Sequence, residues 1–203
     1  MNPIPVLGRS ALLVATLLVQ TAYAAPEVGK PAPAFSAVDT AGETHQLADF
    51  KGKTVVLEWT NDQCPFVKKH YDSGNMQALQ AAAEAEGVVW LSLISSAPGK
   101  QGHVSPQRAD ELTESRKATP SAVLLDEKGT VGRLYDAKTT PHMFVIDPAG
   151  TLVYAGAIDS TPSADPADIP SSQNYVKLAL AAVKEGKPVS TPVSKPYGCS
   201  IKY

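Results

Sequence analysis

Two cysteines are the residues of this chain best suited to covalent chemistry. They are Cys64 and Cys199, and Pro65 follows Cys64 directly. The thiolate is the form that attacks disulfides and peroxides, and a helix N-terminus favours it because unpaired backbone N–H groups lie there. Proline is favoured at the first helical position, so Cys64 is expected at a helix start. This position, after a polar break, predicts a reactive and accessible thiol; an inert buried thiol is the alternative.

Cys199 has three possible roles. It lies in segment 187–203, which contains three prolines. A resolving cysteine would attack a sulfenate or a mixed disulfide on Cys64 and release product. A permanent Cys64–Cys199 disulfide would instead close a loop of about 135 residues and stabilise the fold by roughly 4–5 kcal/mol in the chain-entropy model. In the third role, Cys199 pairs between two chains.

The segments around Cys64 predict an α/β fold. The β-branched, almost wholly apolar run 54–60 predicts a central strand buried on both faces, ended by the polar break 61–63. Further strands are expected at 88–94 and 121–125, and a closing hairpin at 142–158. Helices are expected at 76–86, 105–117 and 172–185, with a small hairpin before them at 36–47. Helical crossovers require parallel strands, so we predict a mixed central sheet with helices on both faces.

The first 24 residues carry an export pattern. Arg9 precedes a short apolar stretch that ends in Ala22-Tyr23-Ala24, which is typical of a cleaved secretory signal peptide. An uncleaved anchor is the alternative, although about 20 apolar residues are needed to span a bilayer. We predict a signal peptide over 1–24, one domain over 25–186 and a tail over 187–203. The protein is then periplasmic or secreted, with no stable membrane span after cleavage.

Composition narrows the choice of partners. The formal net charge is −2, the hydrophobic fraction is 43% and no basic run occurs. Nucleic acid is therefore not an expected partner. An exported chain meets an oxidising compartment, where two cysteines either pair structurally or perform redox chemistry.

Several motifs resemble a known superfamily. The stretch 56–67, with Thr140-Pro141 and the turn 147–150, resembles the active-site strand, cysteine and proline loop of thioredoxins. The lead-in 29–35 with Gly52-Lys53 resembles the alkyl hydroperoxide reductase/thiol-specific antioxidant branch, which is peroxiredoxin-like. The resemblance implies a thioredoxin-like fold and antioxidant-type thiol oxidoreductase activity without a bound cofactor. Its implied partners are a periplasmic thiol reductant, a disulfide-bearing protein or a small hydroperoxide.

The resemblance also implies site residues. Cys64 is the nucleophile, and Thr140 and Pro141 present their backbone to an incoming disulfide if the proline is cis. Pro65 and Phe66, beside the cysteine, complete the candidate substrate-binding set. Glu58, six residues before Cys64, falls where thioredoxins hold a buried acid. It is a candidate proton shuttle, and pairing with Lys53 or another cation is the alternative.

Two departures from the family pattern bear on activity. Leu57 and Asn61 stand where peroxiredoxins carry the proline and the hydroxyl residue of their peroxide pocket. Val67 stands where thioredoxins carry a second cysteine, so a local Cys-x-x-Cys disulfide is impossible.

A rival interpretation has no catalysis. A thioredoxin scaffold stapled by Cys64–Cys199 would bind a protein or copper, with His70 and His142 as candidate copper ligands beside Cys64. No metal is included in the leading prediction. The acidic stretch 159–168 is predicted to be a solvated loop.

Overall fold

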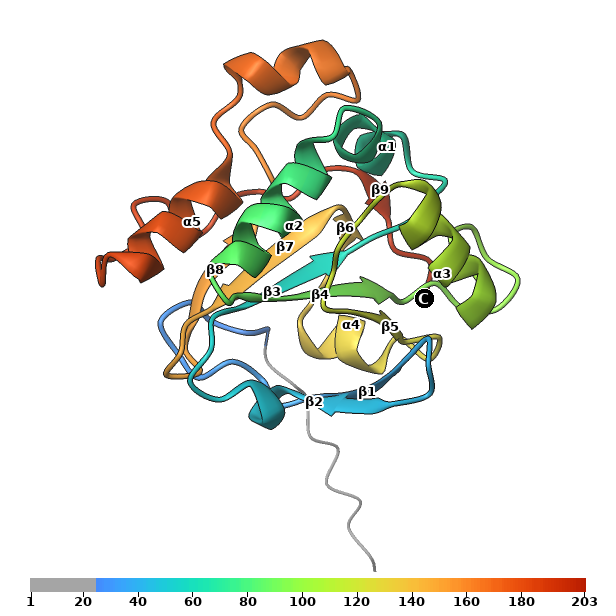
Figure 1. The fold of residues 1–203 in the computed structure, drawn as a ribbon, viewed down its shortest axis with the longest axis horizontal. Coiled ribbons are helices and arrows are strands. Elements are labelled where there is room, and N and C mark those ends of the chain that lie inside the picture. Colours follow the sequence, from blue (N-terminus) through green and yellow to red (C-terminus); the bar gives the residue numbers. More distant parts are fainter. Residues whose placement is uncertain (1–24) are drawn as a thin grey trace, which may run out of the picture.

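A seven-stranded mixed sheet organises the structure, a computed structural model that describes residues 25–203. The strand order is β2-β1-β5-β4-β3-β7-β8, and the sheet crosses the centre of Figure 1. The strands are β1 (Ser36–Asp39), β2 (Thr44–Gln46), β3 (Val55–Trp59), β4 (Val89–Ile94), β5 (Ala122–Leu125), β7 (His142–Ile146) and β8 (Leu152–Gly156). β3 pairs parallel with β4 and antiparallel with β7, which confirms the predicted mixed sheet.

Helices cover both faces of this sheet, as predicted. On one face, α1 (Pro65–Asp72), α2 (Asn75–Ala85) and α5 (Tyr175–Lys184) pack against alternate residues of β3 and β7 such as Val56 and Val145. On the other face, α4 (Thr130–Leu134) and the 3-10 turn η1 (Leu47–Phe50) pack against Leu57 and Trp59. Figure 1 shows α2 and α4 on opposite sides of β3 and β4. The α3 helix (Pro106–Ser115) packs near the ends of β4 and β5.

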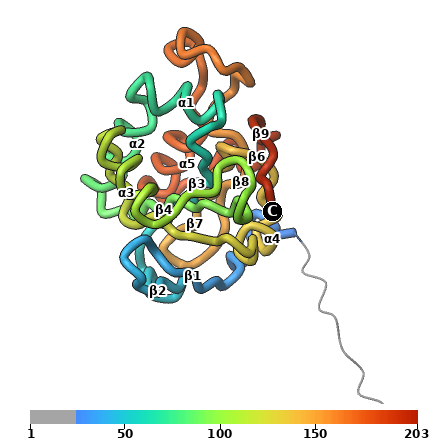
Figure 2. Tube along the Cα trace, turned by 90° about the vertical axis from the view of Figure 1, so that its right-hand side faces the viewer, coloured from blue at the N-terminus to red at the C-terminus, as the bar shows by residue number. Residues whose placement is uncertain are grey.

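A second, two-stranded sheet brings the tail to the domain. Strand β6 (Thr139–Thr140) pairs antiparallel with β9 (Cys199–Ser200), so that Thr140 lies opposite Cys199. In Figure 2 the red end of the chain runs beside β6, next to α4. Segment 187–203 also contacts β8 through a bridge between Ala155 and Val193. The tail is therefore packed along the domain.

The elements absent from the sequence prediction are all short. They are α4, β6, β9, η1 and η2 (Pro166–Ser171). A two-residue strand or a five-residue helix carries too few residues to show a hydrophobic period. The predicted signal peptide over 1–24 lies outside the described residues. Within residues 25–203, no helix has the length and apolarity to cross a membrane.

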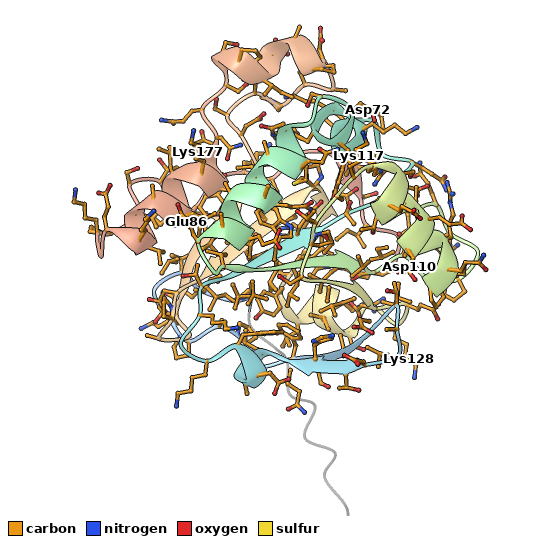
Figure 3. All side chains as sticks on the ribbon, viewed as in Figure 1. Asp72, Glu86, Asp110, Lys117, Lys128 and Lys177 are labelled. Atoms are coloured by element: carbon orange, nitrogen blue, oxygen red, sulfur yellow. The ribbon has the colours of Figure 1, made fainter. Side chains whose placement is uncertain are left out.

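Charged side chains are spread over the outside of the molecule. Figure 3 labels acidic and basic residues on different elements, such as Asp72 on α1, Asp110 on α3 and Lys177 on α5. Asp159 is an exception, because only 3% of its surface is exposed. The prediction that 159–168 is a solvated loop is therefore wrong for Asp159, which a buried lysine holds inside the protein.

Candidate active site

The local chain places Cys64 where β3 gives way to α1. Cys64 is the N-cap residue of α1, and Pro65 occupies the first helical turn. The backbone N–H of Cys64 donates to the carbonyl of Asn61 across 3.1 Å, which closes the turn between strand and helix. Its own carbonyl accepts from the N–H groups of Val67 and Lys68, at 3.1 and 2.9 Å. The sulfur is thus fixed at the helix N-terminus, where the sequence placed it.

Cys64 has no exposed surface. The expectation that its position beside a polar break would leave it accessible is therefore wrong. The thiol faces the body of the protein, where it donates a hydrogen bond to the carbonyl oxygen of Thr140 across 3.0 Å. Tail residues Tyr197 and Cys199 pack against the same cluster of buried side chains. Contact with residues distant in sequence produces this burial.

The two cysteines meet at this point as free thiols. The β6–β9 register sets Cys199 opposite Thr140, and the Cys199 side chain packs against the buried cluster that contains Cys64. Gly198 has a φ of 129°, and a Cβ built on it would overlap the Thr140 carbonyl oxygen. Glycine therefore allows the tail to approach β6 closely enough for the thiols to touch.

The pKa values of the two thiols shift in opposite directions. Burial raises the pKa of Cys64, but hydrogen bonds from the Cys199 thiol, the Thr140 hydroxyl and two backbone N–H groups outweigh this, so the pKa is lowered overall. Burial, followed by the hydrogen bond and charge of Cys64, raises the pKa of Cys199 to about 11. Cys64 is thus the member of the pair that ionises first, and Cys199 stays protonated beside it.

The residues predicted to bind substrate surround this pair. The Thr140–Pro141 peptide bond is cis. Pro65 is exposed and Phe66 is half-buried, with its ring edge-on to Tyr197 at 5.8 Å between centroids. Thr140 is buried, and the tail occupies its strand edge. Their assignment to substrate binding stays a prediction.

Glu58 is buried among donors and contacts no cation within residues 25–203. Tyr71 Oη and Trp90 Nε1 donate to its carboxylate, both at 2.8 Å. Ser92 Oγ donates across 3.1 Å and Gln80 Nε2 across 3.3 Å. Burial raises the pKa of Glu58, and these four hydrogen bonds oppose the shift. In the described chain Glu58 makes no hydrogen bond to Cys64, so its proton-shuttle role stays a prediction.

A buried polar cluster holds the tail next to Cys64. Lys69 Nζ lies 3.3 Å from Asp159 Oδ2 and also donates to the carbonyl of Thr161. The hydroxyl of Tyr197 donates to Asp159 and lies 3.4 Å from His70 Nε2. The Lys69 charge is thus neutralised by Asp159. The sequence pattern alone does not identify Tyr197 and Asp159 as site residues. The run Tyr-Gly-Cys at 197–199 is the sequence signal that could have pointed to Tyr197.

The potential metal ligands do not gather at Cys64. Within the described residues, the one group of three or more closely spaced His, Cys, Asp or Glu ligand atoms is Asp39, Glu43 and His45 on the β1–β2 hairpin. His70 instead contacts Asn75, whose amide lies 2.9 Å from Nδ1. His142 Nδ1 accepts from the Lys138 N–H at 3.2 Å. The histidines of the copper interpretation are thus engaged within the protein.

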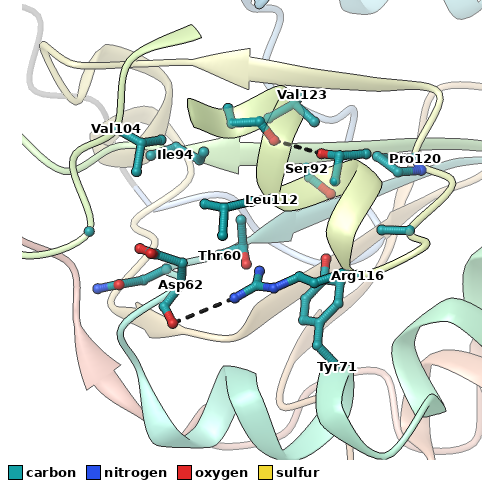
Figure 4. Close-up of a pocket in the computed structure, with 15 residues that line it drawn as sticks. Thr60, Asp62, Tyr71, Ser92, Ile94, Val104, Leu112, Arg116, Pro120 and Val123 are labelled. Atoms are coloured by element: carbon teal, nitrogen blue, oxygen red, sulfur yellow. Dashed lines mark hydrogen bonds between the residues drawn. The ribbon is translucent and has the colours of Figure 1, made fainter. Parts of the chain in front are cut away.

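A small cavity with both polar and apolar lining residues lies beside the strand-to-helix turn. Its volume is about 30 Å³, and Figure 4 shows Thr60, Asp62 and Arg116 lining it. The guanidinium of Arg116 stacks over the Tyr71 ring and donates to the Asp62 carbonyl. Thr60 Oγ1 and Asn61 Nδ2, both buried, have no hydrogen-bond partner within the described chain. Cys64 is not among the lining residues, so this cavity is separate from the thiol pair.

Comparison with protein families identifies the chain. The model of the AhpC/TSA family matches residues 28–155, which is more than half of the sequence and includes Cys64 and the cis proline. The chain belongs to the AhpC/TSA family. Comparison with curated proteins gives no match.

Solved structures show the same fold as this AhpC/TSA member. An uncharacterized conserved protein from Geobacillus kaustophilus is 28% identical, with a TM-score of 0.75 over 87% of this chain and 92% of that one. A hypothetical protein from Sinorhizobium meliloti is 22% identical, with a TM-score of 0.74 over 89% and 96%. A candidate thiol:disulfide interchange protein, DsbE, from Chlorobium tepidum is 23% identical, with a TM-score of 0.58 over 78% and 99%. The fold is thioredoxin-like, and with the family it supports a thiol-dependent redox function.

Proposed function

We propose that this protein is an exported, antioxidant-type thiol oxidoreductase in which Cys64 is the nucleophile and Cys199 the resolving cysteine. The observation that carries the proposal is the β6–β9 pairing, which sets Cys199 opposite Thr140 while the Cys64 thiol donates to the Thr140 carbonyl. Two thiols in contact, one with a lowered pKa and one with a raised pKa, suit a nucleophile and its resolver. Export rests on the pattern of residues 1–24.

The first step is attack by the Cys64 thiolate. On a disulfide, a new bond forms between Sγ and one substrate sulfur, the substrate S–S bond breaks, and the second sulfur leaves as a thiolate. On a hydroperoxide, Sγ bonds to the outer oxygen and the O–O bond breaks, so that Cys64 becomes a sulfenic acid; the alkoxide leaves and takes a proton from the solvent to become the alcohol. Hydrogen bonds from the Cys199 thiol, the Thr140 hydroxyl and the backbone N–H groups of Cys199 and Val67 favour the attacking thiolate.

The second step uses the tail. Cys199 loses its proton and attacks Cys64 Sγ, which releases the bound substrate thiol, or water from the sulfenic acid. The product is a Cys64–Cys199 disulfide, and the pair has lost the two electrons that the substrate gained. A thiol protein of the export compartment then restores both thiols. Asn61 leaves the usual peroxide pocket incomplete, so we favour disulfides as substrates.

Thiol mapping by mass spectrometry tests this function. The reduced protein is treated with a small disulfide or with hydrogen peroxide and then digested. The wild type is expected to yield a Cys64–Cys199 cross-linked peptide. Cys199→Ser is expected to stop at a mixed disulfide or sulfenate on Cys64, and Cys64→Ser to give neither product. Ser200→Ala, beside the resolver, is the matched control and should behave as the wild type.

The rival scaffold interpretation predicts a different result. A structural staple would resist reduction in the folded protein, and Cys64 in Cys199→Ser would remain unmodified by both oxidants. That outcome would overturn the catalytic proposal. Peroxide consumption measured against insulin reduction then separates peroxidase activity from disulfide reductase activity.

A further inference from the structure

The tail lies in the site as an extended peptide would. Cys199 and Ser200 form a backbone ladder with Thr140 and Thr139, and the Cys199 side chain meets Cys64. We propose that this edge of β6 is a groove for an extended partner segment carrying tyrosine, glycine and cysteine in succession, and that Tyr197–Cys199 is its internal occupant. The inference rests on the proposed function and names the partner class for the same site.

The groove requires glycine immediately before the cysteine. Gly198 adopts a φ of 129°, a conformation that residues with side chains rarely adopt. An added Cβ would overlap the Thr140 carbonyl oxygen, which is backbone and cannot rotate away. A partner that pairs with β6 in this register meets the same carbonyl. Its residue before the cysteine must therefore also lack a side chain.

The groove also selects a residue two positions before the cysteine. The Tyr197 ring packs edge-on against Phe66, and Lys69 Nζ lies 5.7 Å from its centroid. Its hydroxyl donates to Asp159 and lies beside His70. This pocket combines an aromatic wall, a cation and a buried acceptor. Tyrosine satisfies all three, whereas an aliphatic side chain would leave Asp159 with one donor fewer.

The tail and a partner cannot occupy the groove together. With the tail in place Cys64 has no exposed surface. The tail remains attached on either side of the ladder, where Ala155 bridges Val193 and the Tyr203 hydroxyl donates to the Ala137 carbonyl across 2.7 Å. Only the short intervening segment has to move aside. A partner segment therefore reaches Cys64 by replacing the backbone pairing between β9 and β6 with an equivalent pairing of its own.

Peptides activated as mixed disulfides with thionitrobenzoate test the inference. The full-length double variant Gly198→Ala/Cys199→Ser disfavours the docked tail and removes the resolver. The Cys64 thiolate attacks the peptide cysteine sulfur, the S–S bond breaks, and the coloured thionitrobenzoate anion reports the rate. A Tyr-Gly-Cys-Ser peptide should react at least about tenfold faster than Tyr-Ala-Cys-Ser, because strain disfavours alanine at this backbone position. An Ala-Gly-Cys-Ser peptide should react several-fold more slowly than the first.

Controls separate this inference from the proposed function. The control is Gly186→Ala/Cys199→Ser, because Gly186 also has a positive φ, 65°, but no neighbouring atom lies within 4 Å of a Cβ built on it. It should keep the tail docked and react more slowly with every peptide. Equal rates for the three peptides would overturn the inference and leave the function standing. No release from any peptide, or from dithionitrobenzoate itself, would overturn the function.

The single variant Cys199→Ser provides a second test if Gly198→Ala unfolds the protein. It should give the same ranking of the three peptides at higher peptide concentration, and equal rates there would overturn the inference.

Discussion

Cys199 lies directly opposite Thr140 in an antiparallel backbone pair, and the carbonyl of that threonine accepts the Cys64 thiol. Thr140 thus pairs with the backbone of Cys199 and accepts the Cys64 thiol through its main chain, while its side chain favours the Cys64 thiolate. The nucleophile, its resolver and the strand edge between them act as one unit. Changes at Thr140 are therefore expected to alter chemistry as well as stability.

Removing the Thr140 hydroxyl should raise the pKa of Cys64. The hydroxyl is one of the groups that hydrogen-bond the thiolate, so Thr140→Val favours the neutral thiol. The ultraviolet absorbance of the thiolate, followed against pH in a Cys199→Ser background, measures the change. Thr139→Val is the matched control, because its hydroxyl donates to the Pro141 carbonyl. An unchanged or lower midpoint in Thr140→Val would show that this hydroxyl does not contribute.

Glu58 is expected to be a major contributor to stability. Glu58→Ala leaves four buried donors without their acceptor, including Tyr71 and Trp90. Each buried unsatisfied donor costs about 1–3 kcal/mol, so the free energy of unfolding should fall by roughly 3 kcal/mol or more. Denaturant unfolding measures this. Exposed Glu84→Ala is the control and should change stability by less than about 0.5 kcal/mol, and a comparably small effect of Glu58→Ala would refute the network.

Acid should destabilise the protein through its buried histidines. Burial lowers the pKa of His70 and of His142 from 6.5 to about 4. The unfolded chain therefore binds these protons at a higher pH than the folded chain. The contribution of each buried histidine to the free energy of unfolding should be fully present above pH 6.5. It should be lost as the pH falls toward 4, by about 3 kcal/mol for each histidine.

A substitution isolates one histidine in this profile. His142 Nδ1 accepts from the Lys138 N–H, and the side-chain oxygen of His142→Asn can take over that hydrogen bond without titrating. The slope of stability between pH 6.5 and 4 should become about half as steep, as measured by denaturant titration at each pH. His103→Asn, at the surface beside Glu127, is the control. A slope unaffected by His142→Asn would show that burial does not hold His142 neutral.

A substitution at the cavity next to the strand-to-helix turn is expected to stabilise the protein. Thr60 Oγ1 is buried without a partner in the described chain, so Thr60→Val should raise the free energy of unfolding by about 1 kcal/mol. Thr113 lines the same cavity, but its hydroxyl donates to the Ala109 carbonyl, and Thr113→Val should not stabilise. Thermal unfolding compares the two. Destabilisation by Thr60→Val would mean that the hydroxyl binds a water in the cavity.

Local patterns predicted the sheet and the position of the nucleophile. The apolar run 54–60 predicted a buried central strand, and Pro65 marked the helix start, because both signals depend on neighbouring residues. The burial of Cys64 could not be predicted in this way. It depends on the β6–β9 ladder, in which each strand has two residues. It also depends on Gly198, whose need to lack a side chain is evident only from its contact with Thr140.

The surroundings of the acids were equally beyond local patterns. The sequence suggested that Glu58 is buried, but its donors come from α1, α2 and β4. The acids, serines and prolines around Asp159 predict a solvated loop. The ion pair with Lys69 joins residues 90 positions apart in the chain. Such contacts join elements that are far apart in the chain, so no single window of sequence contains them.

The docked tail has a thermodynamic consequence for any partner. Its docking free energy is subtracted from the binding free energy of every molecule that competes for the edge of β6. A tail that docks by about 2.7 kcal/mol would leave roughly one molecule in a hundred open and weaken apparent partner affinity about 100-fold. Substitutions of Tyr197, which lies in the displaced segment and contacts Asp159 and Phe66, would then act as affinity mutations although they touch no partner. The tail thus sets the partner concentration at which the thiol pair begins to work.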